Sequence, residues 1–132
     1  MNKEDLKLKL KKFNYRCKEQ SNTLTVNLGS SLDVIIEFSE NDRIIISDKL
    51  RGYNILTGIW SMSVKGSIVF NSIQSVIYSL IFLYINYNLS NIQYSFFMLL
   101  FFILAVGFII LWTTYYLVKL ENFKTLIQIW DN

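Results

Sequence analysis

The sequence predicts a membrane protein of the α+β class, with an N-terminal antiparallel β-meander domain, a two-helix transmembrane hairpin and a short amphipathic C-terminal segment. No Asp, Glu, Lys or Arg occurs from Gly66 to Val118, and all 13 basic and 10 acidic residues lie outside that window. A soluble chain of this size exposes charge along its whole length, so this partition indicates a bilayer. The preceding residues alternate between apolar and polar side chains, which is typical of half-buried strands. We therefore predict a cytoplasmic β-rich domain (residues 1–65), a transmembrane hairpin (66–118) and a cytoplasmic tail (119–132).

The clearest strands of the meander are a hairpin at residues 23–28 and 32–38, joined by a turn at Gly29-Ser30-Ser31. A second turn at 39–42 leads into a strand at 43–47, a loop at 48–52 and a last strand at 60–65. The segment 6–18 alternates in two opposite phases, which predicts two strands with a bulge at Lys11-Lys12. These segments amount to five or six strands. A helix over residues 3–19 is the alternative for the first segment, although its apolar residues would form no stripe.

The hairpin is predicted to consist of helices at about 67–85 and 96–118, which span about 27 and 34 Å at 1.5 Å per residue. Only the flanks of the hairpin carry basic residues, so both termini are expected in the cytoplasm and the connecting loop outside. No apolar run follows the charged start, and no cleavable signal peptide is expected. The tail has apolar residues at helical spacing and should form a short helix on the membrane or against the sheet. A final strand is the alternative.

The first membrane helix carries a polar row at four-residue intervals, which keeps its members on one face. Such a row in hydrocarbon faces something other than lipid. It could pack helices together, line a water-filled pore in an oligomer, or bind a small molecule or lipid. The amide side chains favour the pore, because an unpaired amide is costly to bury. The predicted pore-lining residues are Ser67, Asn71, Gln74, Ser75, Tyr78 and Ser79.

A cluster of six cations with interleaved aromatic residues occupies the segment 7–18, and the predicted bulge would place Lys7, Lys9 and Lys11 on the same face as Arg16 and Lys18. It could be a solubilising edge strand or a surface attracted to anionic lipids. It could also bind an anionic ligand such as a nucleotide or a nucleic-acid strand, with the aromatic rings stacking on bases. The candidate ligand-binding residues are Lys7, Lys9, Lys11, Lys12, Phe13, Tyr15, Arg16 and Lys18.

Enzyme motifs are missing from the sequence, and neither a cofactor nor a metal site is expected. The chain has no His, and Cys17 is its only cysteine, so a common general base and a Cys-based zinc site are excluded. Cys17 is expected to be a small apolar residue on a strand. Asp33 and Glu37 lie on the outward side of an alternating strand and are expected to be solvated.

This layout of a basic β domain followed by a charge-free helical hairpin resembles the small two-helix membrane effectors of bacterial nucleotide-regulated antiphage systems. The resemblance covers the whole chain as a layout, and no family motif carries functional residues over. It implies antiphage defence by a homo-oligomeric ion channel or membrane-disrupting effector in the bacterial inner membrane, gated by the binding of an anionic ligand such as a nucleotide to its soluble domain. The alternative is a non-conducting membrane anchor or an interaction or immunity subunit.

Overall fold

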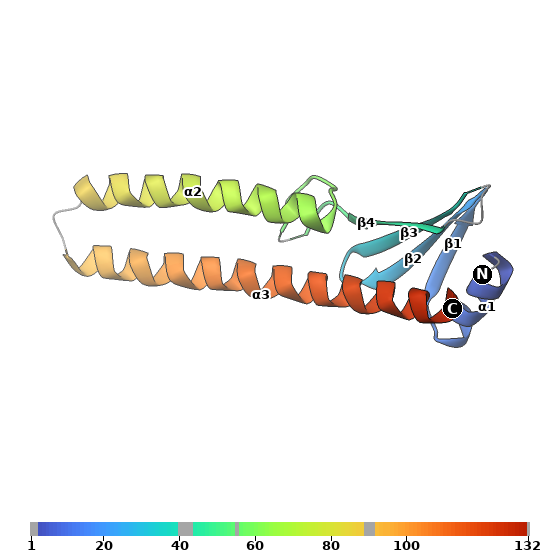
Figure 1. Cartoon of the computed structure of the whole chain (residues 1–132). Coiled ribbons are helices and arrows are strands. Elements are labelled where there is room, and N and C mark those ends of the chain that lie inside the picture. Colours follow the sequence, from blue (N-terminus) through green and yellow to red (C-terminus); the bar gives the residue numbers. More distant parts are fainter. Residues whose placement is uncertain (1–2, 40–43, 55, 89–91, 132) are drawn as a thin grey trace.

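The computed structural model describes residues 3–39, 44–54, 56–88 and 92–131, which form a β-sheet at one end and two long helices that extend from it (Figure 1). The elements in chain order are α1 (Lys3–Lys12), β1 (Arg16–Gln20), β2 (Thr23–Gly29), β3 (Leu32–Phe38), β4 (Ile44–Leu50), α2 (Val64–Asn88) and α3 (Ile92–Asp131). The α+β class is confirmed. Both long helices have the length and composition needed to cross a membrane.

The sheet is an antiparallel meander in the order β1-β2-β3-β4, as the alternating pattern predicts. The β2–β3 hairpin is in the expected place, with Val26 opposite Val34. Its turn has three successive positive φ angles, 81° at Gly29, 53° at Ser30 and 65° at Ser31. Small residues tolerate this conformation better than bulky or β-branched ones do. The sheet has four strands rather than five or six, because the segments 6–12 and 60–65 are not strands.

One face of the sheet is the core of the protein. Its inward side chains on β2 and β3 are fully buried, and they include Leu24, Val26, Val34 and Ile36. Two helices cover this face: α1 through Leu6 and Leu10, and the last third of α3. The α3 residues that are buried there recur at intervals of four, three and four, which places them on one side of the helix: Tyr116, Leu120, Phe123 and Ile127.

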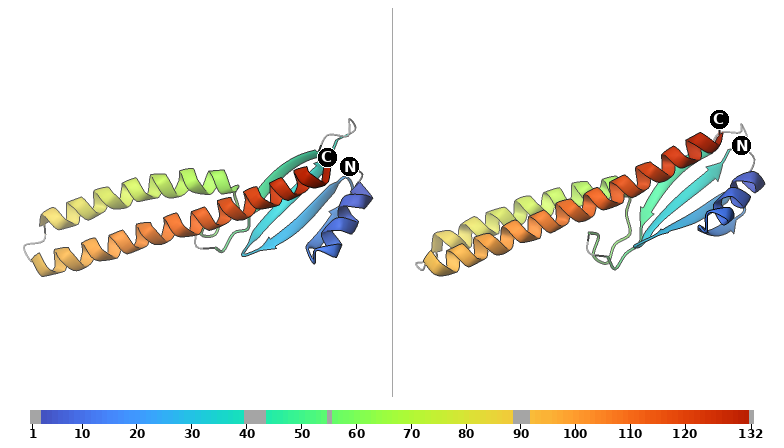
Figure 2. Two further views of the ribbon diagram at one scale, coloured as in Figure 1. Left: turned by 60° about the horizontal axis from the view of Figure 1, so that its bottom comes forward. Right: turned by 90° about the horizontal axis from the view of Figure 1, so that it is seen from below.

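α3 is one uninterrupted helix of 40 residues, about 60 Å long at 1.5 Å per residue. It runs from the far end of the hairpin to the sheet in every view (Figure 2). The predicted tail is therefore helical and packs against the sheet, as one alternative held, but it is the end of α3 rather than a separate segment. The competing strand prediction is wrong. The sequence predicts a break after Val118 because charged residues begin there. These residues lie outside the row of α3 side chains that is buried against the sheet, and the helix continues through them.

The segment before β1 is the helix α1 and not a pair of strands with a bulge. Leu6 and Leu10 are buried one helical turn apart, whereas Leu8 is 65% exposed. Acidic residues occupy the first turn and lysines the last, which suits the helix dipole. The alternative helix over residues 3–19 has no apolar stripe along its whole length, but its first ten residues do, through Leu6 and Leu10. The helix ends at Lys12, and Asn14 has a φ of 60° at the start of the turn into β1.

Two predictions between the sheet and the hairpin are also wrong. β4 continues to Leu50 through residues predicted as a loop, because Leu50 still points into the core and is fully buried. Residues 60–65 form no strand; Met62 makes a single bridge to Leu50, and α2 begins at Val64. The Asp48 carboxylate accepts a hydrogen bond from the Val64 backbone N–H (2.6 Å) and so caps α2 from the neighbouring strand.

Both long helices extend beyond their predicted bounds at the far end of the hairpin. α2 ends at Asn88 and α3 begins at Ile92, inside the segment 86–95 that was predicted as the connecting loop. The turn predicted at 39–42 falls mostly outside the described residues.

Candidate functional site

The predicted ligand-binding residues are divided between two elements. Lys7, Lys9, Lys11 and Lys12 belong to α1, whereas Arg16 and Lys18 lie on β1. Arg16 pairs with Asn27 and Lys18 with Thr25, on the sheet face opposite the core. The single positive face expected from a bulged strand therefore does not form, because the first half of the predicted strand is the helix α1.

Lys7 and Lys9, the first two lysines of the predicted cluster, hold α1 in place. Lys7 forms an ion pair with Glu19 (2.6 Å), to which Lys3 also binds (2.7 Å). Hydrogen bonds from Lys3 and Lys7 lower the pKa of the Glu19 carboxyl to about 2. The Lys9 ammonium donates to the Trp130 carbonyl near the end of α3 (3.1 Å).

The two aromatic residues of the predicted cluster contact α3. The Phe13 ring lies 5.2 Å from the Trp130 ring, and the Tyr15 ring meets Phe123 edge-on at 5.4 Å between centroids. Both contacts join the α1–β1 segment to the end of α3. The cations of the predicted cluster that remain exposed are Lys11, Lys12, Arg16 and Lys18.

Asp33 is not solvated, contrary to the expectation. Its side chain is 12% exposed, and the Arg51 guanidinium binds both carboxylate oxygens, at 2.5 Å from Nε and 2.7 Å from a terminal nitrogen. Asn27 donates a further hydrogen bond (2.7 Å). Burial acts to raise the pKa of the Asp33 carboxyl, but the hydrogen bonds from Arg51 and Asn27 outweigh it, and the pKa lies below its usual value. Glu37 is exposed as expected.

Cys17 lies on β1 and packs partly buried against the core. Burial raises the pKa of its thiol, which disfavours the reactive thiolate. The expectation of a small apolar residue agrees with this environment. In the part of the chain that the structure describes, no group of three His, Cys, Asp or Glu side chains could hold a metal ion.

The polar row of α2 begins in a different environment from the one expected. Ser67 is fully buried and Asn71 is 5% exposed, both at the base of the helix. The Asn71 amide donates to the Leu56 carbonyl in the loop before α2 (2.9 Å) and to the Ser67 carbonyl (2.7 Å). In the single chain these two residues therefore lie in a protein contact rather than on an open helix face.

The other members of the row lie farther along α2. Ser75 and Ser79 are half-buried, and each hydroxyl donates to the carbonyl four residues earlier (2.8 and 2.7 Å). Gln74 is also half-buried, and Tyr78 is 52% exposed.

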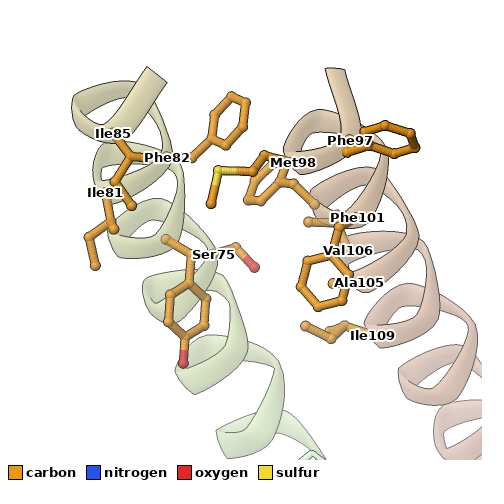
Figure 3. Close-up of a pocket in the computed structure, with 12 residues that line it drawn as sticks. Ser75, Ile81, Phe82, Ile85, Phe97, Met98, Phe101, Ala105, Val106 and Ile109 are labelled. Carbon is orange, nitrogen blue, oxygen red and sulfur yellow. The ribbon is translucent and has the colours of Figure 1, made fainter. Parts of the chain in front are cut away.

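A long groove separates α2 from α3 beyond the sheet. Near the sheet it has a cavity of about 400 Å³ with polar groups from both helices, among them Asn71, Ser75 and Thr113. Towards the hairpin end it has an apolar cavity of about 550 Å³ (Figure 3). Ser75 lines both cavities, and Phe82 and Phe101 are among the rings of the second. The two helices alone do not fill the space between them.

Comparison with known proteins adds no relative: no family model, no curated protein and no solved structure matches the chain. The site is therefore interpreted from its own residues.

Proposed function

We propose that this chain is a multi-pass protein of the bacterial inner membrane, with both termini in the cytoplasm and α2 and α3 crossing the bilayer. The support is the surface of the two helices. Large apolar side chains are exposed on several sides of α2 and of α3 between Phe96 and Val118, far more than a soluble monomer leaves in water. The sheet domain covers only the last third of α3.

The hairpin is proposed to assemble with further copies into a pore. The groove between α2 and α3 carries this proposal, because it is unfilled in one chain and brings Ser75 of the polar row beside Thr113 of the other helix. Helices of other copies can fill the apolar part of the groove, while the polar row turns toward a shared axis. Ser75, Ser79 and Gln74 are the residues proposed to line the conducting path. Asn71 and Ser67 would lie at its cytoplasmic mouth.

The pore is proposed to be controlled by an anionic ligand, a nucleotide or a nucleic-acid strand, bound at the exposed cations of α1 and β1. α3 offers a direct route for control, because the helix that packs on the sheet is the same helix that enters the hairpin. Binding can be measured with a fluorescent oligothymidylate. Reversing two charges with Arg16→Glu and Lys18→Glu should weaken it at least tenfold, whereas Lys124→Glu on α3 should not. Equal affinities in all three proteins would rule out this site.

Conduction can be tested by cysteine accessibility, since Cys17 is the only native thiol. In a Cys17→Ala background in proteoliposomes, Ser75→Cys and Ser79→Cys should react with a water-soluble thiosulfonate, and the reaction should block ion flux. Val76→Cys, on the same turn and 61% exposed, is the matched control and should not react. The pore is refuted by oligomers that pass no ions and leave Ser75→Cys and Ser79→Cys unreactive.

A non-conducting anchor or interaction subunit is the second candidate, and one observation favours it. The three serine hydroxyls of the α2 row each donate to a carbonyl of their own helix, as does Thr114 on α3. These groups are therefore satisfied without water. An anchor predicts a hairpin that folds and inserts but shows neither flux nor thiol reactivity in the same assay.

A further inference from the structure

The loop between β4 and α2 has a defined internal structure. The Asn54 side chain accepts hydrogen bonds from the backbone N–H groups of Leu56 (2.9 Å) and Thr57 (3.0 Å) and donates to the Arg51 carbonyl (2.6 Å). Tyr53 N–H donates to the Gly58 carbonyl (2.5 Å), and Gly58 N–H donates back to the Asn54 carbonyl (2.9 Å). The loop backbone is therefore held by its own hydrogen bonds.

Close backbone packing also closes the base of this loop. A Cβ at Gly52 would lie 2.5 Å from the Ile59 carbonyl oxygen. Only glycine therefore fits at this position, where the beginning and the end of the loop pack against each other. Thr57 is fully buried and its hydroxyl donates to the Arg51 carbonyl (3.3 Å).

The loop lies along the first two turns of α2. Asn71, seven residues after the start of α2, binds the Leu56 carbonyl, so the loop reaches about 10 Å along the helix axis. Leu56 is 1% exposed, and the Trp60 ring meets Phe70 of α2 edge-on at 5.6 Å between centroids. The loop thus covers the part of α2 nearest the sheet.

The outer side of the loop is apolar and aromatic. Tyr53 is 90% exposed, Ile59 66% and Trp60 57%, although the hydrogen bonds around Asn54 hold the loop in place. Exposed basic residues flank these side chains. Arg51, which is paired with Asp33, lies at the start of the loop, and Lys65 lies in the first turn of α2. Aromatic and apolar tips beside cations are characteristic of segments that lie among lipid headgroups.

We infer that residues 51–54 and 56–60, the interfacial loop, insert into the headgroup region of the cytoplasmic leaflet as a third membrane contact beside α2 and α3. The inference rests on the proposed membrane insertion of the hairpin. The bilayer is the partner that fits, because the exposed side of the loop is continuous with the apolar surface of α2 through Trp60 and Phe70. Anionic headgroups of the inner leaflet suit Lys65, since the charge of Arg51 is paired with Asp33.

This placement also sets the depth of both helices. If the loop occupies the interface, the hydrocarbon begins near Asn71 on α2 and near Thr113 on α3, which line the same cavity. The segment 71–88 of α2 then has 18 residues, about 27 Å, and the segment 92–113 of α3 has 22 residues, about 33 Å, on either side of the roughly 30 Å hydrocarbon thickness. The whole of α2, with 25 residues, would be about 37 Å long. The Asn71 amide then lies at the boundary, where it binds the loop.

Spin-label accessibility in liposomes of phosphatidylethanolamine and phosphatidylglycerol tests the inference with the full chain. In the Cys17→Ala background, single cysteines replace Ile59 in the loop, Val76 in α2 and Ser47 on the exposed face of β4. All three sites are exposed, so a label fits without disturbing the fold. Collisions with oxygen report on lipid, and collisions with a water-soluble nickel chelate report on water.

The Ile59 label should collide with the nickel chelate several-fold less than the Ser47 label does, and its oxygen accessibility should lie between those at Ser47 and Val76. An Ile59 label as open to the nickel chelate as Ser47, with Val76 deep in lipid, overturns the inference but leaves the membrane hairpin intact. A Val76 label that is itself open to the nickel chelate refutes the membrane insertion on which the inference rests.

Discussion

Replacing Phe123 with alanine tests whether the end of α3 is part of the sheet core. Phe123 is 3% exposed, and its ring contacts Tyr15 of the segment that joins α1 to β1. Removing a buried phenylalanine side chain costs about 3 to 5 kcal/mol. A domain of this size has a free energy of unfolding of about 5 to 15 kcal/mol in total, so the loss is a large share of it.

Hydrogen exchange measured by mass spectrometry in detergent micelles reports the local stability of the sheet separately from that of the two long helices. The amides of β2 and β3 should exchange faster by roughly two to three and a half orders of magnitude in Phe123→Ala. Ile129→Ala is the matched control, because Ile129 lies on the same part of α3 but is 65% exposed, and its substitution should change the free energy of unfolding by no more than about 0.5 kcal/mol. Equal exchange of β2 and β3 in the two variants would refute the packing of α3 on the sheet.

Three further predictions concern the sheet domain and the interfacial loop. The pKa of Glu19 is depressed to about 2 from 4.5, so its ion pairs stabilise the fold above about pH 4.5 and are lost as the pH falls toward 2; Glu19→Gln should flatten this part of a pH–stability profile. Arg51→Met leaves the Asp33 carboxylate mostly buried without its main partner and should cost about 1 to 2 kcal/mol in urea unfolding, an effect that Asp33→Asn in the same protein should largely cancel. Gly52→Ala should force the Ile59 carbonyl away and speed proteolysis of the interfacial loop, and cleavage at the wild-type rate would contradict the close packing.

The features that follow from a local pattern could be predicted from the sequence. The β2–β3 hairpin and the two apolar helices follow from side-chain alternation, a turn of small residues and a long run without charge. α1 was mispredicted because Lys-Leu alternation mimics a strand, and the burial of Leu6 and Leu10 depends on α3, more than 100 residues later.

The candidate sites depend still more on contacts between distant residues. The ion pair of Asp33 and Arg51 spans 18 residues, and the bond from Asn71 to the loop spans 15. Neither pair could be predicted from the spacing of its residues in the sequence. The amide at Asn71 was a usable signal, since a buried amide needs a partner. In the single chain that partner is the backbone of the interfacial loop.

We propose that α2 and α3 carry the chain across a membrane, with the sheet domain on one side and the hairpin end on the other. The most direct measurement labels two single cysteines in a Cys17→Ala background with a membrane-impermeant maleimide on intact spheroplasts and after lysis. Tyr87→Cys, at a site near the hairpin end that is 90% exposed, should react in intact spheroplasts, whereas Ser47→Cys on β4 should react only after lysis. Labelling of both cysteines from the same side would contradict the claim.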